Sequence, residues 1–200
     1  MLMLMLMVPA VSGCGGKDPV IVAMEESFQD AVPLITQRCQ QILDEQQDKP
    51  ISDIYVSGPI LILISWSENA RTLYDDPWQD TRYRPSTQPK IDWRAIDFMA
   101  SSKDFKPLLA TKDSELRTVV WVTQDVKYMW SYQNGVTAWR PDWKVWIIDL
   151  KEERLSGYQF FEGSPPREVY TLGGDQLGEE PRGELLDWLW LIMLGHQYGL

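Results

Sequence analysis

The residues that most constrain the fold of this chain are Asn134 and Gly135, which stand between two runs typical of β-strands. Asn and Gly tolerate positive φ angles, so the pair favours a two-residue type I′ turn whose twist matches the strands that it joins. Such a turn would pair Gln133 with Val136 and fix every pairing behind it. Residues 118–161 are therefore predicted to form an antiparallel meander of three strands.

The predicted register places apolar side chains opposite one another on one face and opposite charges across from each other on the second. The apolar face would hold the pairs Trp130 with Trp139, Tyr128 with Pro141, Val126 with Trp143, and Val122 with Ile147. The second face would hold Met129 with Arg140, Lys127 with Asp142, Asp125 with Lys144, and Trp121 with Ile148. A third strand would pair Leu155 with Leu150 and Phe160 with Val145, and would end near Glu162, before it reaches Pro141.

Tryptophans of this meander are the candidate binding residues. An exposed aromatic shelf could stack on sugar rings, and Trp139, Trp143 and Trp146 are the possible binding surface. The alternative is that they belong to the core, because burying one Trp removes on the order of 150–250 Å² from water.

Composition limits the classes of partner. The chain has 200 residues, ten Trp and a net charge of −10. The acidic balance argues against binding to duplex nucleic acid or to an anionic membrane surface, which both need Lys and Arg. The single His, His196, excludes a His-rich metal site, and we expect no cofactor and no catalytic residue.

The N-terminus resembles the lipobox of bacterial lipoproteins. An apolar run over residues 1–11 leads to Val11-Ser12-Gly13-Cys14, an aliphatic residue and two small ones before a Cys. The resemblance implies that Cys14 is lipidated and that residues 15–18 form a polar tether. No Lys or Arg precedes the apolar run, which departs from the pattern of a signal peptide. The alternative is an accidental match with an inert Cys14, or a true start further upstream.

The rest of the chain predicts an α+β fold, with the meander and at least one more strand packed with an N-terminal and a C-terminal helix. Apolar spacing predicts a helix that begins at residues 30–32 and ends near Gln46, and a strand over residues 54–66. A helix over residues 184–194 would stop at Gly195 and cover the meander near Trp121. Residues 1–24 would be the leader and tether, and residues 25–200 a single domain.

From residue 116 to residue 191 the order of features resembles an uncharacterised family of bacterial exported proteins. The features are Val119-Val120-Trp121, the Tyr132-x-Asn-Gly turn, Asp149-Leu150, the exit from Phe160 to Pro166, and Trp188-Leu189. The resemblance implies no activity.

Three functions follow from these observations. The first is a non-enzymatic lipoprotein of the bacterial cell envelope that binds a protein or a polysaccharide and meets the membrane only through a lipid on Cys14. The second is a cytosolic interaction domain. The third is a hydrolase that uses carboxylates between Asp75 and Asp97, where Asp92 and Asp97 stand five residues apart; no motif for catalysis supports it.

Overall fold

The computed structural model of the protein describes residues 18–51, 54–74, 86–132, 135–166 and 176–198. The helices are α1 (Pro19–Phe28), α2 (Val32–Gln46), α3 (Glu68–Tyr74), α4 (Trp93–Ser101) and α5 (Arg182–Tyr198). The strands are β1 (Ile60–Trp66), β2 (Lys90–Ile91), β3 (Thr118–Ser131), β4 (Thr137–Asp149), β5 (Arg154–Glu162) and β6 (Gln176–Leu177). The described residues therefore form an α+β protein, as predicted.

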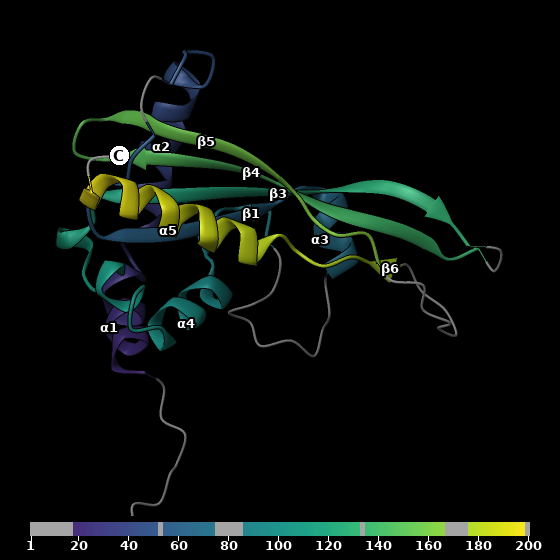
Figure 1. Cartoon of the computed structure of the whole chain (residues 1–200), viewed down its shortest axis with the longest axis horizontal. Coiled ribbons are helices and arrows are strands. Elements are labelled where there is room, and N and C mark those ends of the chain that lie inside the picture. Colours follow the sequence, from purple (N-terminus) through teal and green to yellow (C-terminus); the bar gives the residue numbers. More distant parts are fainter. Residues whose placement is uncertain (1–17, 52–53, 75–85, 133–134, 167–175, 199–200) are drawn as a thin grey trace, which may run out of the picture.

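The strands form one mostly antiparallel sheet in the order β2-β1-β3-β4-β5, with β6 alongside the distal end of β4 (Figure 1). The continuous apolar run of β1 is buried along its whole length and pairs in parallel with β3, at the centre of the sheet. Strands that are buried on both faces read as unbroken Ile and Leu runs, which explains the sequence of β1.

The two faces of the sheet are covered by different helices. The ring of Trp188 in α5 contacts Phe161, so α5 covers the face that carries Phe161 and Trp143. The opposite face, which carries Trp121 and Trp146, lies against α2. The expectation that the C-terminal helix covers the sheet at Trp121 was therefore wrong about the face. Its expected internal packing is confirmed, because Leu185, Leu186, Leu189 and Met193 are buried.

Helix starts follow local chemistry. The Asp18 side chain accepts a hydrogen bond from the Val20 N–H at 2.8 Å, and Pro19 occupies the first turn of α1, where the missing N–H costs nothing. Helix α1 then buries Ile21, Met24 and Phe28 in the core. Helix α2 spans the predicted residues and ends at Gln46 as expected.

The register of the β3–β4 hairpin differs from the prediction. Its turn closes with a hydrogen bond from the Tyr132 N–H to the Val136 C=O at 2.8 Å, so three residues, one more than predicted, lie between this closing pair. A second shift, at Met129, follows between Tyr128 and Trp130. Each shift moves the pairing by one residue, so together they move it by two. A shift of two residues keeps most side chains on their predicted faces of the sheet but gives them different partners on the neighbouring strand.

The predicted pairs are consequently wrong. Trp130 lies opposite Ala138, and Tyr128 lies opposite Trp139, with ring centroids 5.9 Å apart. The expected charge pairs are replaced by Asp125 opposite Asp142 and Lys127 opposite Arg140. Asp142 instead accepts hydrogen bonds from Arg140 on its own strand, at 2.8 and 3.0 Å.

The third strand is shifted by one residue from the prediction up to Ile147. Beyond a bulge between Ile147 and Ile148 the shift is two residues, so Leu155 lies opposite Ile148 instead of Leu150. Phe160 lies opposite Lys144 and Tyr158 opposite Trp146, whereas Val145 had been expected beside Phe160. The expected end of the strand at Glu162 is confirmed.

Two further boundaries differ from the expectation. Helix α5 continues through Gly195 to Tyr198, because a single Gly costs a helix interior only about 1 kcal/mol. The strand predicted over residues 54–66 begins only at Ile60, as β1.

Candidate functional site

A groove lined partly by aromatic side chains lies between α2 and the face of the sheet that carries Trp121 and Trp146; we call it the α2 groove. Its volume is about 310 Å³, which lies at the lower end of the range of small-ligand sites. It is lined by Gln40, Leu43, Gln47, Ser65, Thr87, Gln88, Pro89, Trp121, Thr123 and Trp146. Three elements build it: α2, the segment that leads into β2, and the central strands.

The floor of the α2 groove is made by two indoles that face each other across β3 and β4. Trp121 is almost fully buried and is paired with the half-buried Trp146. The ring of Tyr158 extends the floor beyond the lining residues, since its centroid lies 5.5 Å from that of Trp146. Tyr158 is 41% exposed, so one end of this aromatic row is open to solvent.

The rim of the α2 groove is neutral and polar. Gln40, Leu43 and Gln47 recur at spacings of three and four, which places them on one side of α2. The Gln40 amide N–H donates to Asp44 at 2.8 Å, so the carbonyl oxygen of Gln40 is the group free to accept. A shallower hollow of about 560 Å³, lined partly by Asp44 and Glu45, adjoins the groove at Gln88 and Pro89.

The three tryptophans proposed from the sequence as a binding surface do not lie together. Trp146 lines the α2 groove, whereas Trp143 is fully buried on the opposite face. Trp139 lies on the same face as Trp143 and contacts the ring of Tyr128. Of the three, Trp146 alone lines this groove. The Gln rim was missed, and the spacing of Gln40 and Gln47 around Leu43 was the only signal for it.

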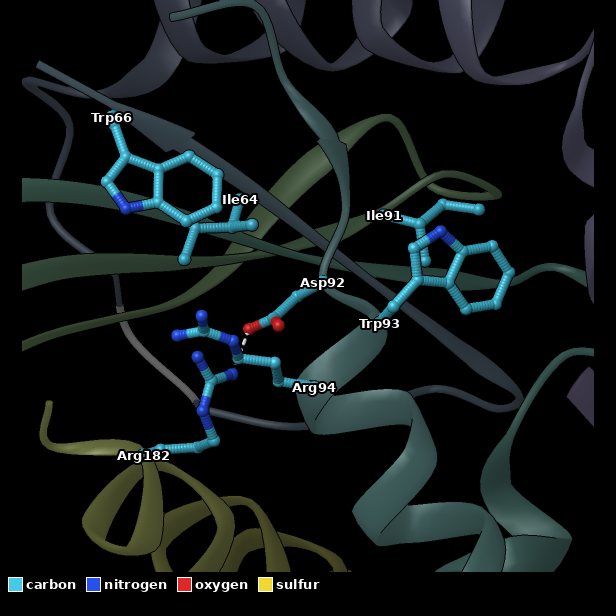
Figure 2. Close-up of a pocket in the computed structure, with 7 residues that line it drawn as sticks. All are labelled: Ile64, Trp66, Ile91, Asp92, Trp93, Arg94 and Arg182. Atoms are coloured by element: carbon cyan, nitrogen blue, oxygen red, sulfur yellow. Dashed lines mark hydrogen bonds and ion pairs between the residues drawn. The ribbon is translucent and has the colours of Figure 1, made fainter. Parts of the chain in front are cut away.

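A cluster of charges joins α4 to α5 on the other side of the sheet, and Figure 2 shows the Asp92 carboxylate pointing toward Arg182, with Arg94 alongside. Arg182 pairs with Asp92 and donates to Glu180 at 2.5 Å. Burial lowers the pKa of the Arg182 guanidinium, but the charges of Asp92 and Glu180 outweigh burial and raise it above its ordinary value. The guanidinium also lies 5.0 Å from the centroid of Trp143.

Beneath this cluster a polar row crosses the sheet. Trp66, Gln124 and Trp143 are aligned on neighbouring strands, and the Trp143 Nε1–H donates to the Gln124 Oε1 at 2.6 Å. The Gln124 amide nitrogen and the Trp66 Nε1 are buried without a hydrogen-bond partner. The adjoining cavity measures only about 10 Å³, which is room for roughly one water molecule. A substrate does not fit there, so the cluster is structural.

Of the carboxylates expected for a hydrolase, Asp92 lies among the described residues and does not open into a substrate-sized pocket. Asp92 caps α4 by accepting from the Ala95 N–H at 3.2 Å and is neutralised by Arg182. Asp75 lies outside the described residues, as do Asp76, Asp80 and the proposed lipidation site Cys14. The described ranges contain no group of three side chains suited to hold a metal ion.

Cys39 is a free thiol on the buried stripe of α2. Burial raises the pKa of this thiol to about 12, and the nearby charge of Arg38 opposes the shift only in part. A thiol in this state is a poor nucleophile. No described helix combines the length and the apolar character needed to cross a membrane.

Comparisons with known proteins give little help. No family model and no curated protein matches the chain. A solved structure of a Xanthomonas campestris protein, described as belonging to the family DUF330, is similar over 60% of this chain and 74% of that chain, at 12% identity and a TM-score of 0.30.

Proposed function

We propose that the chain is a non-enzymatic lipoprotein of the bacterial cell envelope whose domain binds a neutral polysaccharide in the α2 groove. The observation that carries the proposal is the row of Trp121, Trp146 and Tyr158 beneath a rim of uncharged amides and hydroxyls. Aromatic faces bury the apolar C–H face of a sugar ring, while Gln and Thr side chains both donate to and accept from sugar hydroxyls.

Charge favours a neutral sugar over an anionic one. Among the described residues, no Lys or Arg lines the groove, and the hollow that adjoins it carries Asp44 and Glu45. An acidic polysaccharide would bring negative charge toward these carboxylates and find no cation in the groove to offset it. The open end at Tyr158 suits a polymer, because a chain can continue past the groove.

Binding is tested with soluble neutral hexasaccharides of glucose, xylose and N-acetylglucosamine, and with a hexamer of galacturonate as the anionic comparison. We expect at least one neutral sugar to change the intrinsic Trp fluorescence and to give heat in titration calorimetry. Trp146→Ala should weaken that binding about tenfold, since an aromatic contact is worth roughly 0.5–1.5 kcal/mol beyond its buried area.

The matched control is Trp130→Ala, which removes a half-buried indole from the same hairpin but outside the groove. Binding that is equally weakened in both variants, or restricted to the galacturonate hexamer, would contradict the groove as a neutral-sugar site.

The lipid anchor rests on the sequence Val11-Ser12-Gly13-Cys14. Labelling with an alkyne fatty acid in a bacterial host should mark the natural chain, and Cys14→Ala should abolish the label. Cys39→Ala is the matched control and should keep it, because the thiol of Cys39 is buried. A label that persists in Cys14→Ala would end the lipoprotein proposal while leaving the groove untouched.

A further inference from the structure

The end of β5, over residues 158–162, is an outer edge of the sheet with which no described strand pairs. The Gly163 N–H donates to the Pro141 C=O at 2.7 Å, so Gly163 turns its main chain toward β4. Alternation along an antiparallel strand then turns Phe161 inward as well, and turns the N–H and C=O groups of Tyr158, Phe160 and Glu162 outward. These outward groups have no main-chain partner among the described residues.

Two other parts of the sheet edge are protected. The Tyr55 N–H donates to the Ser156 C=O at 3.0 Å, which covers the beginning of β5. The opposite edge of the sheet is β2, which is only two residues long. Short strands and covering segments are the usual means by which sheets avoid pairing with other chains.

The open stretch lacks those protections. Tyr158 and Phe160 are 41% and 40% exposed, and no Lys or Pro interrupts residues 158–162. The Phe160 C=O accepts only a local hydrogen bond among the described residues, from the Gln159 side chain at 3.2 Å, which a pairing strand could replace. The Glu162 carboxylate accepts from Arg140 at 3.0 and 2.7 Å, so its charge is already offset. Exposed aromatic side chains beside unpaired main-chain groups are typical of an edge that adds a strand.

We infer that β5 pairs antiparallel with β5 of a second copy of this chain, about a two-fold axis at Phe160. Such an axis places Phe160 opposite its own copy and Tyr158 opposite Glu162, each pair exchanging main-chain hydrogen bonds. The aromatic rings would meet each other, and the Tyr158 hydroxyl could donate to the Glu162 carboxylate. No pair of like charges faces across this junction, which is what makes the edge complementary to itself.

The pairing would also align the two α2 grooves. Partners in an antiparallel sheet keep their faces on the same side, so Trp146 of both copies would open toward one side of a continuous sheet. If the proposed sugar binding holds, one polymer could occupy both grooves and gain affinity by avidity.

The test introduces a charge of either sign at Phe160 in the full chain and measures the oligomeric state by analytical ultracentrifugation. We expect the natural chain to dimerise, and Phe160→Lys and Phe160→Glu each to weaken dimerisation about tenfold or more, because like charges would face across the axis. An equal mixture of the two variants should recover the dimer. All samples share one N-terminus, so any association through residues 1–17 is common to them.

The matched control is Gln159→Lys, which adds the same charge one residue away, where the main chain faces β4. This variant should dimerise like the natural chain. A natural chain that stays monomeric at 100 μM, or a dimer that survives both single substitutions, overturns the inference. Neither result depends on sugar binding, so the two proposals fail separately.

Discussion

At the scale of single residues, the hydrogen bond between Trp143 and Gln124 is a polar contact enclosed in the core. Both side chains are fully buried, and the indole N–H has the Gln124 Oε1 as its hydrogen-bond acceptor. Removing one partner leaves the other buried and unsatisfied, which costs about 1–3 kcal/mol. We expect Trp143→Phe and Gln124→Leu each to lower the free energy of unfolding in urea by at least that amount.

The double variant provides the control. Once both polar groups are gone, neither is left unpaired, so the loss in Trp143→Phe/Gln124→Leu should be smaller than the sum of the single losses by about 1 kcal/mol. Strict additivity would show that the hydrogen bond contributes nothing.

The Cys39 thiol makes stability depend on alkaline pH. Its folded pKa is raised to about 12 from an ordinary value of 9.0, so the folded state favours the neutral thiol. That contribution is complete below pH 9 and is lost as the pH rises toward 12, where the unfolded thiol ionises first. The free energy of unfolding should therefore fall more steeply between pH 9 and 11 in the natural chain than in Cys39→Ala. Parallel profiles would contradict the burial of this thiol.

At the scale of elements, the hairpin shows what a sequence pattern determines and what it does not. Alternation of apolar and polar residues predicts which face a side chain joins, and Val122, Val145 and Ile147 share a face as expected. The pairing partner depends on turn length and bulges instead. An extra residue in the turn and a shift at Met129 are each compatible with the same Asn-Gly sequence, so the pattern could not predict the register.

The turn itself gives a testable difference between two glycines. Gly135 has a φ of +82°, a conformation that costs a residue with a side chain roughly 1–2 kcal/mol. Gly183 lies in the first turn of α5, where Ala is the better helix former by about 1 kcal/mol at most. A Cβ at either position meets no atom within 4 Å, so sterics do not confuse the comparison.

Thermal unfolding should therefore shift in opposite directions, with Gly135→Ala less stable and Gly183→Ala equal to or more stable than the natural chain. Equal destabilisation by both changes would contradict the strained turn at Gly135.

The charge cluster between α4 and α5 predicts that replacing Arg182 alone strongly lowers the free energy of unfolding. In Arg182→Met the Asp92 carboxylate would stay buried without its cation, which typically costs about 3–5 kcal/mol. Asp92→Asn keeps a side-chain oxygen for the helix cap and removes the charge, so adding it to Arg182→Met should recover part of the loss.

Arg71→Met serves as the matched control, because its pair with Glu68 is exposed and should be worth less than about 1 kcal/mol. If Arg182→Met costs no more than Arg71→Met in chemical unfolding, the cluster is not structural.

At the scale of the whole molecule, the candidate site depends on contacts that are distant in sequence. The composition and the run of tryptophans predicted an aromatic protein, yet Trp143 and Trp146 face opposite sides of the sheet. The α2 groove forms only because α2 lies on the face left uncovered by α5, and the segment at Gln88 closes one end of it. Which helix covers which face of the sheet depends on the path of the whole chain, so local sequence patterns could not predict the groove.

That same long-range packing predicts how the molecule unfolds. Buried residues of α1, α2, the central strands, α4 and α5 belong to one hydrophobic cluster, in which Phe28 of α1 is fully buried. Truncating such a side chain costs about 3–5 kcal/mol. If the cluster is one cooperative unit, Phe28→Ala should move the urea midpoint of helix circular dichroism and that of Trp fluorescence by the same amount.

The comparison variant is Val22→Ala, since Val22 lies in the same helix and is 38% exposed. It should move neither midpoint by much. If α1 were instead a separate appendage, as part of residues 1–24 was expected to be, Phe28→Ala would shift only a small fraction of the circular dichroism signal. The unfolding midpoint of the sheet tryptophans, followed by fluorescence, would then stay unchanged. Coincident shifts require that α1 and the sheet unfold together, because none of the ten tryptophans lies in α1.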